Sequence, residues 1–284
     1  FPAERPRCAV PYDLGEVQGP ARTAAHRDLA ELTEITDQAF IDTIARLGIT
    51  PNRRYDVYFI NRIIGQGGYA GNSMVVSYID RNYAGGGLYE VLVHEAVHLM
   101  DQQFAPRDMI FLREGVAVWT SGGHYKQENL HTRAAALLTT DQYLPLAWVV
   151  DNFYPAQHEI GYLQAGAFVN YLVDQYGWEQ VQAFYGSVTA EGYDTPSAAL
   201  DAGLQAHFGK TITQVEQEWL TFLSQQSVEA ADVSDLLTTV RFYDAMREYQ
   251  QGYDPTAYFL NAWLPSTLEM RQRNIVADVM RRPS

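Results

Sequence analysis

The residues with the clearest chemical potential in this chain form the run His94-Glu95-Ala96-Val97-His98. On a helix of 3.6 residues per turn, two histidines four positions apart point from one face toward a common metal. Glu95 lies about 100° round the same helix, so its carboxylate can reach a metal-bound water but is poorly placed to act as a ligand. Two nitrogen donors, an open coordination position and a general base are what a zinc hydrolase needs. The alternative is a pair of core histidines, each requiring its own hydrogen-bond partner.

A catalytic zinc usually takes three protein ligands, and the candidate for the third is Glu114, sixteen positions after His98. Its flanks in "FLREGVAVW" are apolar, which predicts a mostly buried helix. A buried carboxylate is costly when unpaired and stabilised when bound to a dication. A solvated glutamate beside its neighbouring arginine is the alternative. The competing donors are His124, His131, His158 and Asp101, the last of which could instead orient an imidazole from behind the metal site.

The elements that must position these residues are also visible in the sequence. Residues 20–47 carry apolar side chains at helical spacing and stop at Gly48. The segments 55–60 and 74–79 are short, aromatic and β-branched, and therefore predict strands, with a glycine-rich loop or irregular edge strand between them. Helices follow around "HEAVH" and "MIFLREGVAVWTSG", and the chain beyond Gly123 reads as further helices. The fold class expected is α+β: a small sheet and an active-site helix, followed by a mostly α-helical C-terminal half.

Composition narrows the classes of partner. The 284-residue chain has a net charge of −14 with no basic stripe, which argues against nucleic acid. No run of eighteen apolar residues predicts a transmembrane segment. Cys8 is the single cysteine, so neither an intrachain disulfide nor a thiolate zinc site is available. The first residue is Phe1 rather than Met, and we expect an extracytoplasmic protein, secreted or anchored upstream.

The HExxH motif followed by a helix bearing Glu-Gly resembles the gluzincin metallopeptidases, the clan of thermolysin and the aminopeptidase N-like enzymes. The succession "HEAVHLMDQQF", "FLREGVAVW", "LPLAWVVDNF" and "YLQAGAFVNYLVDQYGW" more closely resembles the peptidase MA-like domains, over roughly residues 20–224. The resemblance implies a zincin-like fold. The expected organisation is an irregular leader (1–19), a zincin-like subdomain (20–123), a helical subdomain that completes the peptidase unit (124–224) and a C-terminal helical extension (225–284).

Carried over by position, the resemblance implies one zinc ion per chain on His94, His98 and Glu114. Glu95 would activate a zinc-bound water for attack on a peptide carbonyl, and the substrate would be a peptide or protein. Tyr162 resembles the tyrosine that hydrogen-bonds the developing oxyanion in related aminopeptidases. Its spacing to the next glycine departs from theirs, four residues instead of three, so a packing role is the alternative for Tyr162.

One departure bears on specificity. Aminopeptidases of this clan carry an acidic residue in a strand that holds the free amine, whereas "GGYAGNSMVVSYI" has no Glu or Asp before Asp80. This favours an endopeptidase over an aminopeptidase. The "GGYAG" segment could pair its backbone with an extended peptide, or form a plain turn. The alternative function is a catalytically idle zinc-containing domain that binds peptides or proteins, although such a domain has no need of Glu95. A helical scaffold without metal would require both motifs to be coincidental.

Overall fold

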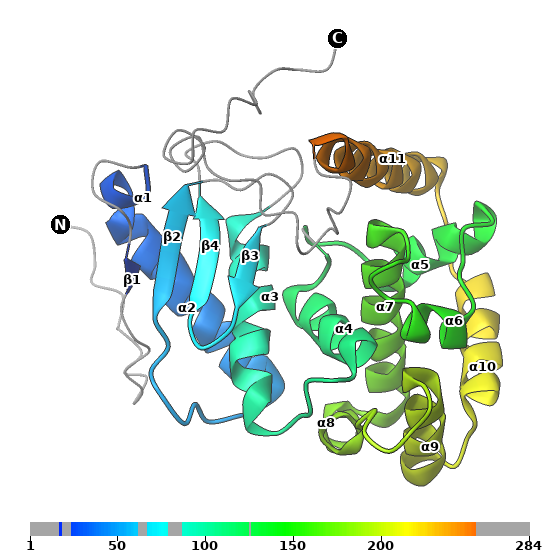
Figure 1. The fold of residues 1–284 in the computed structure, drawn as a ribbon. Coiled ribbons are helices and arrows are strands. Elements are labelled where there is room, and N and C mark those ends of the chain that lie inside the picture. The colour runs from blue at the N-terminus through cyan, green and yellow to red at the C-terminus, as the bar shows by residue number, and fades with distance from the viewer. Residues whose placement is uncertain (1–16, 19–23, 62–66, 79–86, 125, 254–284) are drawn as a thin grey trace.

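A computed structural model describes residues 17–18, 24–61, 67–78, 87–124 and 126–253 of the chain, and it has the expected mixed α+β fold (Figure 1). The strands are β1 (Val17–Gln18), β2 (Val57–Asn61), β3 (Gly68–Ala70) and β4 (Met74–Tyr78). The helices are α1 (Ala24–Arg27), α2 (Leu29–Leu47), α3 (Leu88–Met100), the 3₁₀ turn η1 (Asp101–Gln103), α4 (Ile110–Ser121), α5 (Leu130–Thr139), α6 (Leu146–Asp151), α7 (His158–Tyr176), α8 (Trp178–Ser187), α9 (Pro196–Phe208), α10 (Ile212–Ser224) and α11 (Ala230–Tyr253).

The sheet has the strand order β1-β2-β4-β3. Strands β1, β2 and β4 run parallel, while β3 pairs antiparallel with β4 and forms an edge. Alternate side chains of β4 are buried, with Met74 and Val76 fully inside, as the period of two in a half-covered strand requires. Both predicted strands are thus confirmed, and the glycine-rich segment between them supplies the edge strand. β1 lies in the expected irregular leader, whose residues 1–16 are outside the described part.

The predicted helix over residues 20–47 forms two pieces, α1 and α2, separated at Asp28. As predicted, α2 ends at Gly48, which takes a left-handed φ of 64° and donates its N–H to the Ile44 carbonyl. Helix α2 packs against α3, the helix that carries the two histidines of the HExxH motif. Helix α2 therefore helps to hold in place the helix on which the two histidines lie.

Helices α4 and α7 cross at two glycines. A Cβ atom on Gly115 would lie 2.6 Å from the Ala165 carbonyl oxygen, and one on Gly166 would lie 2.2 Å from Cγ1 of Val118. Neither distance leaves room for a side chain, so the two helix backbones approach closely. This crossing places the residues beside Gly115 against the middle of α7, at Ala165 and Val169.

A continuous cluster of buried apolar residues extends from Ala25 near the N-terminus to Val240 in α11. It therefore runs across the expected subdomain boundaries at residues 123 and 224. Helix α11 lies over α5 and α7 (Figure 1). Of the helical extension expected over residues 225–284, residues 254–284 lie outside the described part. Among the helices that are described, none has the length and apolar character needed to cross a membrane, as expected.

Candidate metal centre

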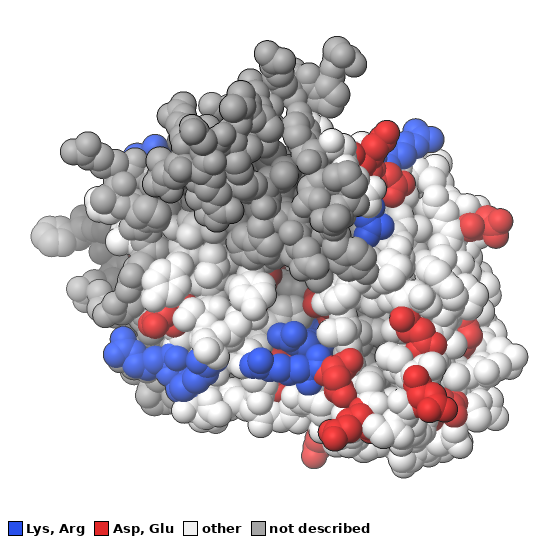
Figure 2. Space-filling model, in the orientation of Figure 1, with Lys and Arg blue, Asp and Glu red and all other residues white. Residues whose placement is uncertain are grey.

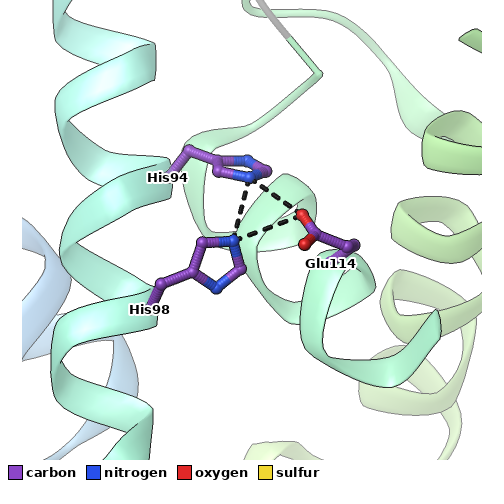
Figure 3. A group of neighbouring side chains, drawn as sticks. All are labelled: His94, His98 and Glu114. Carbon is purple, nitrogen blue, oxygen red and sulfur yellow. Dashed lines mark hydrogen bonds and ion pairs between the residues drawn. The ribbon is translucent and has the colours of Figure 1, made fainter. Parts of the chain in front are cut away.

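The HExxH residues lie on α3, which begins after Gly87 and runs as a regular helix to Met100. Its apolar side chains face the sheet and α2, and this burial fixes which way the polar residues point. His94 and His98 consequently project together toward α4, where Glu114 points back at them (Figure 3). Thr120 and Ser121 bond to carbonyls of α4 near its end, where Gly122 closes the helix in a left-handed conformation.

The three side chains meet at a nearly equilateral triangle of donor atoms. The Nε2 atoms of His94 and His98 lie 3.2 Å apart. The Glu114 Oε2 atom lies 3.1 Å from the His94 Nε2 and 3.2 Å from the His98 Nε2. Within the described part of the chain, this is the one group of His, Cys, Asp and Glu side chains close enough together to hold a metal ion.

The triangle fits zinc. Zinc–nitrogen and zinc–oxygen bonds of about 2.0–2.1 Å in a tetrahedron place neighbouring donor atoms about 3.3–3.4 Å apart, close to the distances found here. Two imidazoles and one carboxylate suit zinc, whereas magnesium and calcium favour all-oxygen sites. Hydrogen bonding alone does not explain this arrangement. If Glu114 accepts a hydrogen bond from both rings, each Nε2 carries a hydrogen, and these two N–H groups face each other at 3.2 Å without an acceptor between them. The Nδ1 atoms of both histidines are buried and bond none of the described residues.

Electrostatics in the triangle favour a cation. Burial lowers the pKa of His94 to about 4, although Glu114 opposes the shift. Burial also disfavours the charged form of His98, but the carboxylates of Glu114 and Asp101 outweigh it and raise the pKa of His98 to about 10. Burial works against ionised Glu114 as well, yet the two histidines hold its pKa well below the usual range. An ionised, buried Glu114 is the environment in which a dication binds favourably.

Glu95 lies beside the triangle and against the edge strand. A Cβ atom on Gly68 of β3 would come within 2.6 Å of the Glu95 Cγ and 2.9 Å of its Oε1, so only glycine allows this contact. The Glu95 side chain is buried, and this burial raises the pKa of its carboxyl to about 7. A carboxyl with a pKa near neutrality can both accept and release a proton at physiological pH.

Asp101 lies behind His98 and is buried, with an exposed fraction of 1%. Its Oδ2 lies 4.0 Å from the His98 Nδ1, 3.5 Å from the Arg113 Nε, and accepts a 2.7 Å hydrogen bond from the Tyr185 hydroxyl. Asp101 does not join the donor triangle, and its position favours the role behind the imidazole over that of a competing donor. Tyr185 was not among the residues singled out from the sequence, because it is 84 positions away on α8 and nothing local marks it.

Tyr162 also lies at the site, one turn before the glycine at the α4–α7 crossing. Its ring centroid is 6.2 Å from that of His94. Burial, followed by the charge of Glu114, holds the pKa of the Tyr162 phenol well above its ordinary value. The phenol therefore stays protonated and available as a hydrogen-bond donor.

The competing histidines are elsewhere. His124 pairs through Nδ1 with Glu159 Oε2 at 2.9 Å, and His131 bonds to Asp174 at 2.7 Å. His158 packs its ring against those of His124 and Tyr162. None of the three joins the donor triangle of His94, His98 and Glu114.

The site retains limited access to solvent. The side chains of His94, His98 and Glu114 are exposed by 12%, 8% and 9%. Figure 2 shows the molecule hollowed between its sheet side and its helical side, with Lys and Arg side chains along the lower rim of the hollow. Comparison of the chain with protein-family models, with curated proteins and with solved structures gave no match, so the functional conclusion rests on the geometry of this site.

Proposed function

We propose that this protein is a zinc-dependent metallopeptidase of the gluzincin type, with a zincin-like fold, that hydrolyses peptide bonds within peptides or proteins. The observation that carries the proposal is the donor triangle of His94, His98 and Glu114, with the buried carboxyl of Glu95 beside it. Those three residues would hold one zinc ion per chain. When bound, zinc would polarise the scissile carbonyl and lower the pKa of a coordinated water toward neutrality.

The remaining chemistry belongs to the protein's own side chains. Glu95 accepts a proton from the attacking water and later delivers it to the leaving amine, so that one water is consumed for each peptide bond broken. Tyr162 donates its phenolic proton in a hydrogen bond to the oxygen that gains negative charge. The raised pKa values of both groups support these roles, because Glu95 exchanges protons near pH 7 and Tyr162 keeps its own.

Strand β3 supports a mode of substrate binding. It is the sheet edge nearest the metal centre, and the Glu95 side chain lies against its Gly68. An extended peptide that adds to this edge by backbone hydrogen bonds would run past Glu95. The described part of β3 has no acidic side chain to hold a free amine, which supports internal cleavage.

The proposal is tested with a peptide library whose N-termini are blocked, incubated with protein loaded with zinc. We expect cleavage that a chelator stops, and close to one zinc per chain by elemental analysis. Glu95→Gln should keep the zinc and reduce the cleavage rate by about 10²- to 10⁴-fold, because the general base is lost. Glu114→Ala should weaken zinc retention, while Glu179→Gln, an exposed change on α8, should alter neither property.

Two results would count against the proposal in different ways. If Glu95→Gln still cleaves peptides, Glu95 is not the general base. Stoichiometric zinc with no cleavage of any library member would favour the second reading, a catalytically idle zinc-containing domain that binds peptides or proteins.

A further inference from the structure

Helix α11 lies outside the part of the chain that resembles the peptidases, yet its contacts converge on the turns that surround Tyr162. The Gln157 side chain, at the N-terminus of α7, donates to the Val240 carbonyl and to Asp244 Oδ1, both at 3.1 Å. Arg247 donates to the Tyr154 carbonyl at 3.1 Å. These bonds hold α11 across the beginning of α7, four residues before Tyr162.

The first connection from α11 to the site is a stack of rings. Tyr162 lies against His124 with ring centroids 4.3 Å apart and planes inclined by 15°. Tyr243 of α11 stacks on the same His124 at 5.6 Å. His158 touches all three, at 4.5 Å from Tyr162, 4.8 Å from His124 and 4.6 Å from Tyr243. Since interiors are close-packed, the orientation of one ring in such a stack constrains the others.

The second connection is a buried ionic network. Arg133 of α5, 5% exposed, contacts Asp235 of α11 and donates to the Thr239 hydroxyl at 3.0 Å. The same guanidinium lies 3.7 Å from Glu159 Oε1, and Glu159 in turn holds the His124 ring through its other oxygen. Because Glu159 is fully buried, its carboxylate depends on these partners.

We infer that α11 is part of the catalytic unit and that Tyr243 is a positioning residue for Tyr162. Tyr243 holds the rings of His124 and His158 against Tyr162, and Asp235 fixes the same His124 through Arg133. The inference rests on the proposed function for its kinetic consequence, but the position of the Tyr162 ring can be observed without any activity.

The experiment compares Tyr243→Leu with Tyr193→Leu, the same change at a tyrosine between α8 and α9 that is 47% exposed. The first readout is ¹⁹F NMR of metal-free full-length protein labelled with 3-fluorotyrosine, in which the Tyr162 signal is identified by its loss in Tyr162→Phe. Tyr243→Leu should shift and broaden that signal, whereas Tyr193→Leu should leave it in place. Asp235→Asn, which weakens the ionic connection, should produce a smaller shift of the same signal.

The second readout is peptide cleavage by the zinc-loaded proteins. Displacement of a catalytic group by about 1 Å costs up to about a hundredfold in rate, so we expect kcat to fall about tenfold to a hundredfold in Tyr243→Leu. KM and zinc content should remain near those of the unaltered protein, which a general loss of folding would not permit. Tyr193→Leu should keep the kcat of the unaltered protein.

The outcomes separate the two proposals. An unmoved Tyr162 signal in Tyr243→Leu overturns the positioning role, whatever the kinetics. A moved signal with unchanged kcat, or an unchanged kcat in Tyr162→Phe, overturns the catalytic importance of that position. A protein that shows the expected NMR shifts but cleaves no peptide contradicts the peptidase proposal and leaves the structural coupling established.

Discussion

Replacing Tyr185 by Phe tests whether the metal centre depends on a hydrogen bond that reaches it from a distant helix. The Tyr185 hydroxyl donates to Asp101 Oδ2 at 2.7 Å, and the same oxygen lies 4.0 Å from the His98 Nδ1. The Asp101 Oδ1 atom bonds none of the described residues. After the change, the closest remaining contact of the carboxylate is the Arg113 Nε at 3.5 Å. Asp101 is then free to move toward Arg113 and away from the imidazole.

The expected magnitude follows from the burial of Asp101. A hydrogen bond to a buried, ionised group contributes about 1.5–3 kcal/mol, so we expect the free energy of unfolding to fall by about 2 kcal/mol. For a chain of 284 residues the melting temperature would fall by about 3–4 °C. Groups that orient a metal-binding histidine change metal affinity by about 10- to 100-fold. Tyr185 acts on His98 only through Asp101, so we expect the lower figure: Tyr185→Phe should bind zinc about tenfold more weakly.

The assay is competition for zinc between metal-free protein and a chromophoric chelator at fixed pH, with urea unfolding of the same samples. Tyr143→Phe is the matched control, because its hydroxyl also donates to a carboxylate, Glu216, at 2.8 Å, in a region that packs against Trp219 of α10. It should lower stability without changing zinc affinity. If Tyr185→Phe lowers stability but binds zinc as tightly as the unaltered protein, Asp101 does not support the metal centre and the reasoning is wrong.

Three further changes have calculable consequences. Gly115→Ala places a Cβ 2.6 Å from the Ala165 carbonyl oxygen, so calorimetry should show that the free energy of unfolding falls by about 1–3 kcal/mol. Gly68→Ala pushes on the Glu95 side chain, and should slow peptide cleavage while zinc content stays constant. Burial, followed by repulsion from a neighbouring carboxylate, raises the pKa of Glu128 from 4.5 to about 7. An acid whose pKa is raised by folding stabilises the protein when protonated, and this contribution is lost as the pH rises from about 4.5 through 7. Glu128→Gln should therefore flatten this part of the pH profile. It should be more stable than the unaltered protein at pH 8 by at most about 3 kcal/mol, because the change also removes the 3.1 Å ion pair with Arg133.

Each of these changes has a control and a contrary outcome. Gly252→Ala, where an added Cβ meets nothing within 4 Å, should not destabilise the protein. Equal losses in Gly252→Ala and Gly115→Ala would contradict the close helix crossing. Gly68→Ala with undiminished cleavage would show that β3 does not restrict Glu95. A Glu128→Gln variant with the pH profile of exposed Glu179→Gln would mean that Glu128 is ionised in the folded protein at neutral pH.

Local patterns in the sequence predicted the parts of the site that lie close together along the chain. The spacing of His94 and His98 requires only a helix, and the largely apolar sequence around them buries α3 on nearly all sides. Glu114 could be found from its apolar flanks, since α4 is buried on most sides. Gly115 and Gly166 carried a further signal, because a glycine inside a buried helix often marks a close approach of backbones.

Contacts between distant segments could not be predicted in the same way. The hydroxyl of Tyr185 meets Asp101 across 84 positions, and Tyr243 reaches His124 across more than a hundred; neither tyrosine has a distinguishing neighbour in the sequence. The pairing of the two-residue strand β1 with β2 likewise depends on tertiary packing, since two residues carry no periodicity.

The close crossing of α4 and α7 has a mechanical consequence for the metal centre. At Gly115 the α4 backbone meets the Ala165 carbonyl, and at Gly166 the α7 backbone meets the Val118 side chain. Both contacts are too close to allow the helices to slide, so Glu114 and Tyr162 move together. The two histidines belong to a different helix, α3, which faces α4 across the site. Any widening between α3 and α4 therefore draws Glu114 away from His94 and His98 before it disturbs the α4–α7 contact. If zinc is held as proposed, its rate of exchange should then report how often α3 and α4 separate.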